Sequence, residues 1–137
     1  MIQFTIPGNP AGKARARVTR YSTYTPDKTV NYEVLVKEIF AINYPRHTLL
    51  EKALWMTVDA YFDVPKSYTK GKKLAAKHNM IRPTKKPDAD NILKIIADSL
   101  NGIAYKDDSQ IVNARVRKLF DEGKPRIEVT LEEVPND

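Results

Sequence analysis

Residues 88–102, which read DADNILKIIADSLNG, decide the fold, because they encode a helix that is apolar on nearly every side. Its polar residues recur at spacings of three and four and form one narrow stripe: Asn91, Lys94, Asp98 and Asn101. Asn101-Gly102 provides the stop, since glycine accepts the left-handed conformation that closes a helix. We therefore expect a helix from about Asp90 to Leu100 that is buried except for a thin polar line facing a cleft.

Strands and two further helices surround this segment. Alternating apolar residues predict strands near 2–6, 54–62, 111–118 and 126–134. A strong helix is expected from Thr25-Pro26 to about Asn43, and a weakly helical, lysine-rich surface segment from Lys66 to His78. The order strand, helix, strand, helix, helix, strand, strand predicts an α+β fold. We expect a single compact domain, 1–137, with a small mixed β-sheet of about four strands and helices packed on it.

The composition limits the classes of partner that the protein is expected to bind. The chain has 137 residues, 42% of them hydrophobic, and a formal net charge of +6, which suits a polyanion such as nucleic acid or an anionic membrane. Membrane insertion needs roughly 18 consecutive apolar residues or a strongly basic amphipathic helix, and the sequence has neither. The first residues alternate like a strand and do not resemble a secretory signal, so we expect a cytoplasmic protein that does not bind membranes.

Two groups of carboxylates are the candidates for metal binding. Asp88 and Asp90 lie two apart where the chain enters the helix, so both can converge on one cation, whereas the alternative for Asp90 is an ordinary helix cap. Asp108 belongs to an Asp107-Asp108 pair that is also typical turn material, and it approaches the others only if the helix and the strand near 111 pack together. Oxygen ligands without a cysteine or histidine cluster favour Mg²⁺ or Mn²⁺.

Lys94 has two interpretations. It lies four residues after Asp90 and forms either an intrahelical ion pair or a contact with a phosphate oxygen beside the metal. The sequence contains no covalent nucleophile motif, no P-loop and no glycine-rich dinucleotide loop. Metal-activated water attacking a phosphodiester is the chemistry that this set of residues favours.

Three stretches together resemble the RusA family of Holliday junction resolvases. They are Lys86-Pro87-Asp88-Ala89-Asp90-Asn91-Ile92-Leu93-Lys94, Asp98-x-Leu100-Asn101-Gly102 and Asp107-Asp108-Ser109-Gln110-Ile111-Val112. The N-terminal Pro10-x-x-Lys13-x-Arg15-x-Arg17 also resembles the basic motif of many members, so the match spans nearly the whole chain.

This resemblance implies a homodimer that resolves four-way DNA junctions by paired, Mg²⁺-dependent phosphodiester hydrolysis in recombination and repair, often encoded by phages or prophages. It implies that Asp88, Asp90 and Asp108 bind the metal and that Lys94 is catalytic with them. It assigns Asp98 and Asp107 supporting roles, and we expect Asp98 to position Lys94.

Branched DNA is a dense phosphate surface, so basic side chains are the candidates for backbone contacts: Lys13, Arg15, Arg17, Arg20, Lys85 and Lys86. The alternative is a solvated basic face.

Two other functions remain open from the sequence. One is a branched-DNA nuclease that prefers flaps or forks, and the other is a non-catalytic DNA-binding accessory protein.

Overall fold

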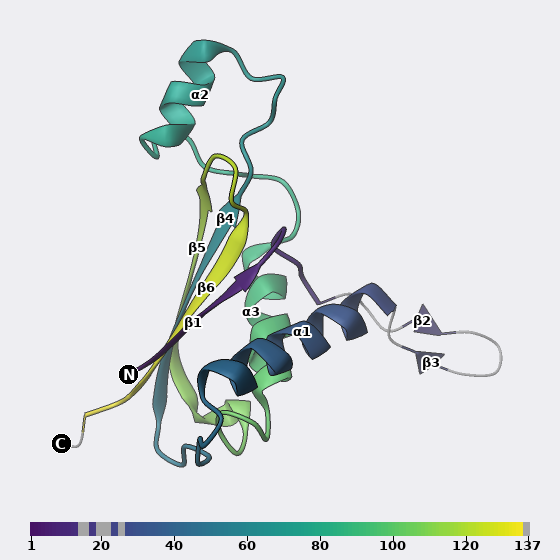
Figure 1. The fold of residues 1–137 in the computed structure, drawn as a ribbon, viewed down its shortest axis with the longest axis vertical. Helices are drawn as coiled ribbons and strands as arrows, with labels where there is room; N and C mark the ends of the chain where they lie inside the picture. The colour runs from purple at the N-terminus through teal and green to yellow at the C-terminus, as the bar shows by residue number, and fades with distance from the viewer. Residues whose placement is uncertain (14–16, 19–22, 25–26, 136–137) are drawn as a thin grey trace.

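The computed structural model describes residues 1–13, 17–18, 23–24 and 27–135 (Figure 1). Its elements in chain order are β1 (Ile2–Pro7), β2 (Arg17–Val18), β3 (Thr23–Tyr24), α1 (Asp27–Asn43), β4 (Leu54–Phe62), α2 (Lys70–Lys77), α3 (Ala89–Leu100), the 3₁₀ turn η1 (Asp108–Gln110), β5 (Ile111–Phe120) and β6 (Arg126–Glu133). The order expected from the sequence is confirmed. A short β2–β3 pair is added between β1 and α1, while Thr25-Pro26 lies outside the described residues.

Four strands form one mixed sheet in the order β1-β6-β4-β5. The β4–β5 pair is parallel, and the β1–β6 and β4–β6 pairs are antiparallel. Alternate residues of β4, from Leu54 to Phe62, are buried, as the period of a strand requires. The predicted α+β fold with a small mixed sheet is therefore confirmed, whereas the single-domain expectation stays a prediction.

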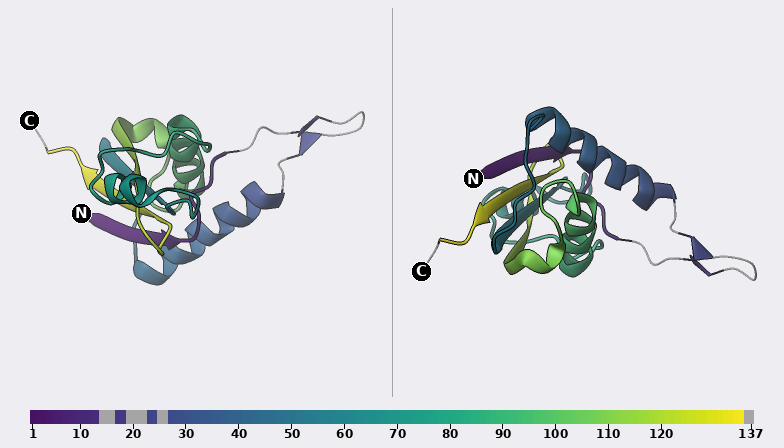
Figure 2. Two further views of the ribbon diagram at one scale, coloured as in Figure 1. Left: turned by 90° about the horizontal axis from the view of Figure 1, so that it is seen from above. Right: turned by 90° about the horizontal axis from the view of Figure 1, so that it is seen from below.

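The core lies between this sheet and the helices α1 and α3, which cover one of its faces (Figure 2). From α1, Val36 and Phe40 are buried, and the Phe40 ring meets Phe4 of β1 edge-on at a centroid distance of 5.4 Å. The Tyr105 hydroxyl is buried and donates to the Ala97 carbonyl at 2.6 Å. Burial raises the pKa of Tyr105, so its hydroxyl stays protonated. No helix among the described residues is long and apolar enough to cross a membrane.

Helix α3 is the buried helix that the sequence predicts. Its buried residues cover most of its circumference: Ile92, Ile95, Ile96, Ala97, Ser99 and Leu100. It begins at Ala89, one residue earlier than expected, and ends at Leu100 before Gly102, whose φ of 72° is left-handed.

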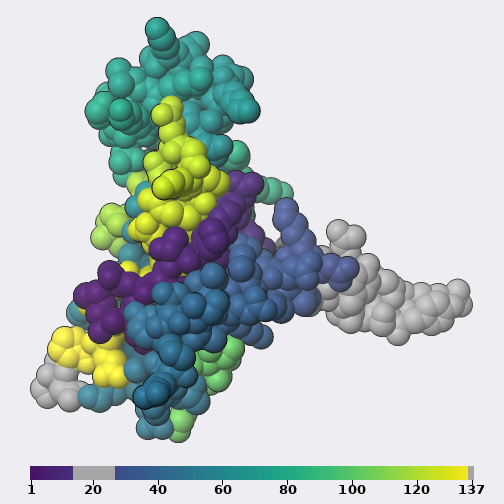
Figure 3. All heavy atoms as spheres, viewed as in Figure 1, coloured from purple at the N-terminus to yellow at the C-terminus, as the bar shows by residue number. Residues whose placement is uncertain are grey.

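The segment between β4 and α3 forms a lobe beyond the ends of β4, β5 and β6 (Figures 1 and 3). Only Lys70–Lys77 of the expected helical stretch is helical. The Thr69 side chain caps the start of α2 by accepting from the Lys72 amide at 3.2 Å. The lobe returns directly into Asp88 at the start of α3.

Candidate active site

Asp88 and Asp90 lie at the first turn of α3. Asp88 occupies the cap position with an extended backbone, and its carbonyl accepts from the Ile92 amide at 3.0 Å. Its carboxylate makes no capping hydrogen bond. Within the described ranges, neither carboxylate takes part in a hydrogen bond or an ion pair with another side chain. The capping alternative therefore does not account for either side chain, and both remain available to an external ligand.

The two aspartates of the later pair have different roles. The Asp107 side chain accepts from the Ser109 amide at 3.1 Å, and the Gln110 side chain accepts from the Asp107 amide at 2.9 Å, which together form a capping box on η1. Hydrogen bonding to Ser109 lowers the pKa of Asp107 below its usual value. The turn interpretation is thus correct for Asp107, whereas the Asp108 carboxylate accepts from the Asn101 side chain.

Asn101 holds Asp108 in place. The Asp108 amide donates to the Asn101 side-chain oxygen at 2.7 Å, and the Asn101 amide group donates to an Asp108 carboxylate oxygen at 3.4 Å. The Gln110 side chain also ties η1 to the loop before β4 by donating to the carbonyls of Leu50 and Lys52 at 2.9 and 3.0 Å. Sequence reasoning placed Asn101 in the polar stripe but missed this positioning role.

A hollow of about 330 Å³ lies between α3 and the beginning of β5. Its lining brings together three predicted catalytic residues, Asp90, Lys94 and Asp108, with Asp98 beside them. The remaining lining is apolar: Leu93, Ala97, Ile111 and Ala114. The Asp90–Lys94 ion pair is not formed among the described residues, so Lys94 lines the hollow without a carboxylate bonded to its ammonium.

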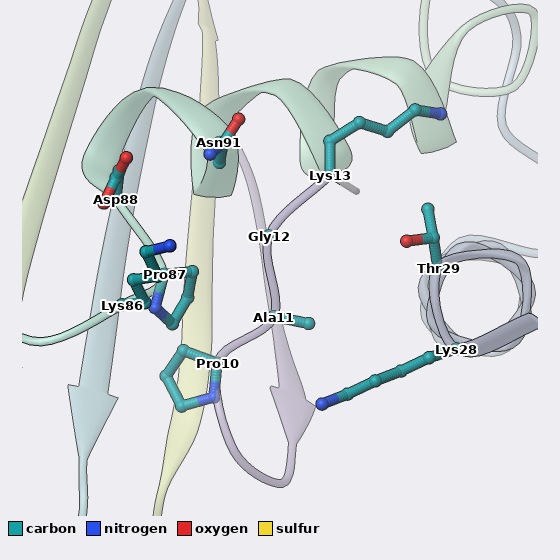
Figure 4. Close-up of a pocket in the computed structure, with 10 residues that line it drawn as sticks. All are labelled: Pro10, Ala11, Gly12, Lys13, Lys28, Thr29, Lys86, Pro87, Asp88 and Asn91. Atoms are coloured by element: carbon teal, nitrogen blue, oxygen red, sulfur yellow. The ribbon is translucent and has the colours of Figure 1, made fainter. Parts of the chain in front are cut away.

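Asp88 lines a different pocket, of about 490 Å³, at the start of α3 (Figure 4). Asn91 and Lys86 line it with Asp88, together with Lys28 and Thr29 from α1 and with residues 10–13, the arm that follows β1. The described part of the chain contains no group of three or more His, Cys, Asp or Glu side chains arranged to hold a metal ion. The structure thus brings two of the three predicted ligands to one hollow, and the convergence of Asp88 with them stays a prediction.

Lys13 joins the arm to both helices. Its ammonium lies 3.2 Å from a Glu33 carboxylate oxygen of α1 and 3.4 Å from an Asp98 oxygen of α3, and its amide donates to the Asn91 carbonyl at 3.0 Å. Burial lowers the pKa of Lys13, but Glu33 and Asp98 outweigh burial and raise this pKa above its usual value. Asp98 therefore has an ion pair with Lys13, while the expectation that it positions Lys94 stays a prediction.

The other predicted DNA contacts are only partly described. Lys85 and Lys86 are exposed just before α3, and the Lys85 carbonyl accepts from the Lys118 ammonium at 2.5 Å. Arg15 and Arg20 lie outside the described residues, and Arg17 is placed only as part of β2. DNA contact by this set stays a prediction.

Comparison with known proteins identifies the family. A family model described as endodeoxyribonuclease RusA matches residues 7–132. The chain is also 36% identical over 139 residues to a Bacillus subtilis (strain 168) protein described as "Uncharacterized protein YqaN", covering 97% of this chain and 96% of that protein. The resemblance seen in the sequence is confirmed: the chain belongs to the RusA family of endodeoxyribonucleases.

Proposed function

We propose that this protein is a metal-dependent endonuclease that resolves four-way DNA junctions by paired phosphodiester hydrolysis, acting as a homodimer in recombination and repair. Family membership implies Holliday junction resolvase nuclease activity. The observation that supports the finer proposal is the hollow beside α3, where Asp90, Lys94 and Asp108 come together.

The donor chemistry of the hollow fits Mg²⁺, with Mn²⁺ as a substitute. The titratable groups in its lining are three carboxylates and one ammonium, without histidine or cysteine, and hard cations prefer such oxygen ligands. Asp90 and Asp108 would hold the ion, with Asp88 as the third proposed ligand. When bound, the ion supplies positive charge that activates a water and offsets charge on the phosphate.

Lys94 is the proposed phosphate ligand. It is an exposed cation in the hollow, and no described carboxylate neutralises it through an ion pair. Its ammonium can donate to a non-bridging phosphate oxygen and stabilise the charge that develops in the transition state. The positive end of the α3 dipole lies in the same region and favours an anion there.

Paired cleavage requires two such sites. The described residues contain one hollow with this set of side chains, so one chain provides one site. A two-fold homodimer presents two identical sites to two of the four strands of a junction, which is the simplest symmetric solution. A homodimer is therefore part of the proposal.

Cleavage of a mobile four-way junction and of a matched linear duplex, with Mg²⁺ or with EDTA, tests the proposal. We expect the junction to be cut only with the metal. Asp90→Asn should lose cleavage while keeping or strengthening junction binding, because a negative charge facing phosphate is removed. Asp63→Asn is the matched control, since asparagine keeps the side-chain oxygen that accepts from the Gly123 amide at 3.2 Å. Failure to cut the junction with any divalent ion would refute the proposal.

The same substrates separate the alternatives. Faster cleavage of flaps or forks than of junctions would favour a general branched-DNA nuclease. A non-catalytic accessory protein would bind the junction equally well as wild type or Asp90→Asn and would cut nothing.

A further inference from the structure

We infer that the lobe formed by residues 64–87, with α2 at its tip, is a second DNA-backbone-binding surface that holds a duplex arm away from the scissile phosphate. The inference rests on the proposed function, since it names where the same branched substrate is also held. None of the DNA contacts expected from the sequence lies on α2.

The charge of the lobe is wholly positive. Between Asp63 and Asp88 the chain has no acidic residue. The whole chain carries +6 and the lobe alone +8, so the remaining residues together carry −2. The lobe therefore carries more positive charge than the net charge of the whole chain. Its cations are Lys66, Lys70, Lys72, Lys73, Lys77, Arg82, Lys85 and Lys86.

Most of these cations are exposed, and none has an acidic partner among the described residues. Seven of the eight are exposed, and Lys73 is half-buried. The ion pairs found in the described part of the chain engage cations elsewhere, such as Lys13, Arg117 and Arg126, and none engages the lobe. Lys72 instead lies 4.4 Å from the centre of the Tyr68 ring, which orients its ammonium without neutralising it. Unneutralised, clustered cations are what a phosphate backbone recognises.

The lobe is held against the sheet by packing. Ala76 of α2 is fully buried in the core cluster, and the Tyr68 ring meets Phe120 of β5 edge-on at 6.1 Å. The Arg82 guanidinium donates to the Lys118 carbonyl at 3.4 Å, and the Lys118 ammonium donates to Lys85. Because these contacts fix the backbone before DNA arrives, binding has less ordering entropy to overcome.

The position of the lobe suits a second contact. Figures 1 and 3 show it projecting beyond the sheet, on the side where α3 begins. Its final residues, Lys85 and Lys86, are followed by Pro87 and Asp88, so the basic segment ends beside the first turn of α3. A strand cleaved beside Asp90 has an adjoining duplex arm, and the lobe offers that arm a row of phosphate contacts.

A basic helix can also lie on an anionic membrane surface, and this is the rival use of α2. Leu74 and Met80 are 56% and 78% exposed on the lobe. Such a membrane helix carries a broad apolar face rich in Trp, Phe and Leu. The eight residues of α2 offer Leu74 as their one large apolar side chain, so DNA is the better match.

The test compares two triple variants that remove the same charge. Lys66→Gln/Lys70→Gln/Lys77→Gln alters the lobe, and Lys37→Gln/Arg46→Gln/Lys52→Gln alters exposed cations on α1 and the loop after it. Binding of a fluorescent four-way junction is measured in EDTA across a series of salt concentrations, with circular dichroism confirming the fold. We expect the lobe variant to bind about 10- to 100-fold more weakly, with a salt slope smaller by about 2 to 3, because each phosphate contact contributes about 0.9. The control variant should keep the wild-type slope.

Equal losses in the two variants, or wild-type binding by the lobe variant, would overturn the inference while leaving the proposed function intact. So would tight binding of wild type, but not of the lobe variant, to phosphatidylserine vesicles together with unaltered junction binding. Cleavage of the junction by wild type with Mg²⁺ is scored separately and bears on the proposed function alone.

Discussion

Asn101 binds Asp108 at two points, accepting from its amide at 2.7 Å and donating to its carboxylate at 3.4 Å. This pair links the end of α3 to η1, two segments separated by a turn. Asp90 and Lys94 sit on α3, whereas Asp108 comes from η1, so the pair sets the separation between the two halves of the candidate site. Positioning of a ligand by such a partner is a general requirement of metal sites.

Asn101→Ala should lower kcat for junction cleavage by about 10- to 100-fold, the usual effect of losing a residue that orients a ligand. Junction affinity should change little, since Asn101 is not among the proposed phosphate contacts. Asn31→Ala, on the exposed side of α1, is the control. An unchanged kcat in Asn101→Ala would show that Asp108 needs no support from α3.

Asp107 and Asp108 should respond differently to the same substitution. Asp108→Asn removes a proposed metal ligand and should abolish cleavage. Asp107→Asn keeps an oxygen that caps η1 and should retain activity, whereas Asp107→Ala should lower Tm.

Because the pKa of Asp107 is lowered in the folded protein, its contribution to stability is present above its unfolded pKa and is lost as pH falls through the folded pKa. The Tm difference between Asp107→Ala and wild type should therefore shrink in acid. Loss of activity in Asp107→Asn alone would reverse the two roles.

Much of the fold was predictable because burial leaves a periodic pattern. The apolar run of α3 and the alternation in β4 lie within one or two residues of their expected bounds. The sheet order was not predictable: β6 sits between β1 and β4, and only tertiary packing decides which strands become neighbours. The bounds of the short α2 were also hard to predict, since a single threonine cap decides where the helix begins.

The candidate site was predictable in its residue types but not in its geometry. Spacing placed Asp90 and Lys94 on one side of α3, and the hollow confirms that they share it. Spacing did not reveal that Asp88 faces a separate pocket, because the side-chain direction changes where an extended segment enters a helix. The partners of Lys13 lie 20 and 85 residues away, so local pattern contained no signal for them.

Metal binding should be detectable without cleavage. A ligand that binds only the folded state at about 100 times its Kd stabilises by about 2.7 kcal/mol, so Mg²⁺ or Mn²⁺ should raise Tm. Asp90→Asn and Asp108→Asn should each reduce that rise, and Asp63→Asn should not. A rise that survives in Asp90→Asn and Asp108→Asn would place the ion elsewhere.

Lys13 should contribute to stability through its two ion pairs. Its side chain is 22% exposed, and those of Glu33 and Asp98 are 17% and 28% exposed, so removing the ammonium leaves two poorly solvated carboxylates close together. We expect Lys13→Met to lower the free energy of unfolding by about 1 to 3 kcal/mol, with coupling to Glu33→Gln of at least about 0.5 kcal/mol in a double-mutant cycle. Additive effects in urea unfolding would mean that the Lys13–Glu33 contact contributes nothing.

Gly12 and Gly71 differ in the space around them, so alanine should have opposite effects at the two positions. A Cβ on Gly12 would lie 2.8 Å from the Pro87 Cβ and 3.1 Å from the Asn91 Cβ, whereas a Cβ on Gly71 in α2 would meet nothing within 4 Å. Gly12→Ala should therefore push the arm away from the start of α3, with a cost of about 1 to 3 kcal/mol in unfolding free energy. Gly71→Ala should stabilise by up to about 1 kcal/mol, because alanine favours a helix. Since Pro87 directly precedes Asp88, Gly12→Ala should also lower kcat for junction cleavage at temperatures well below its Tm. If kcat stays at the wild-type value while stability falls, the position of the arm does not affect the proposed active site at the start of α3.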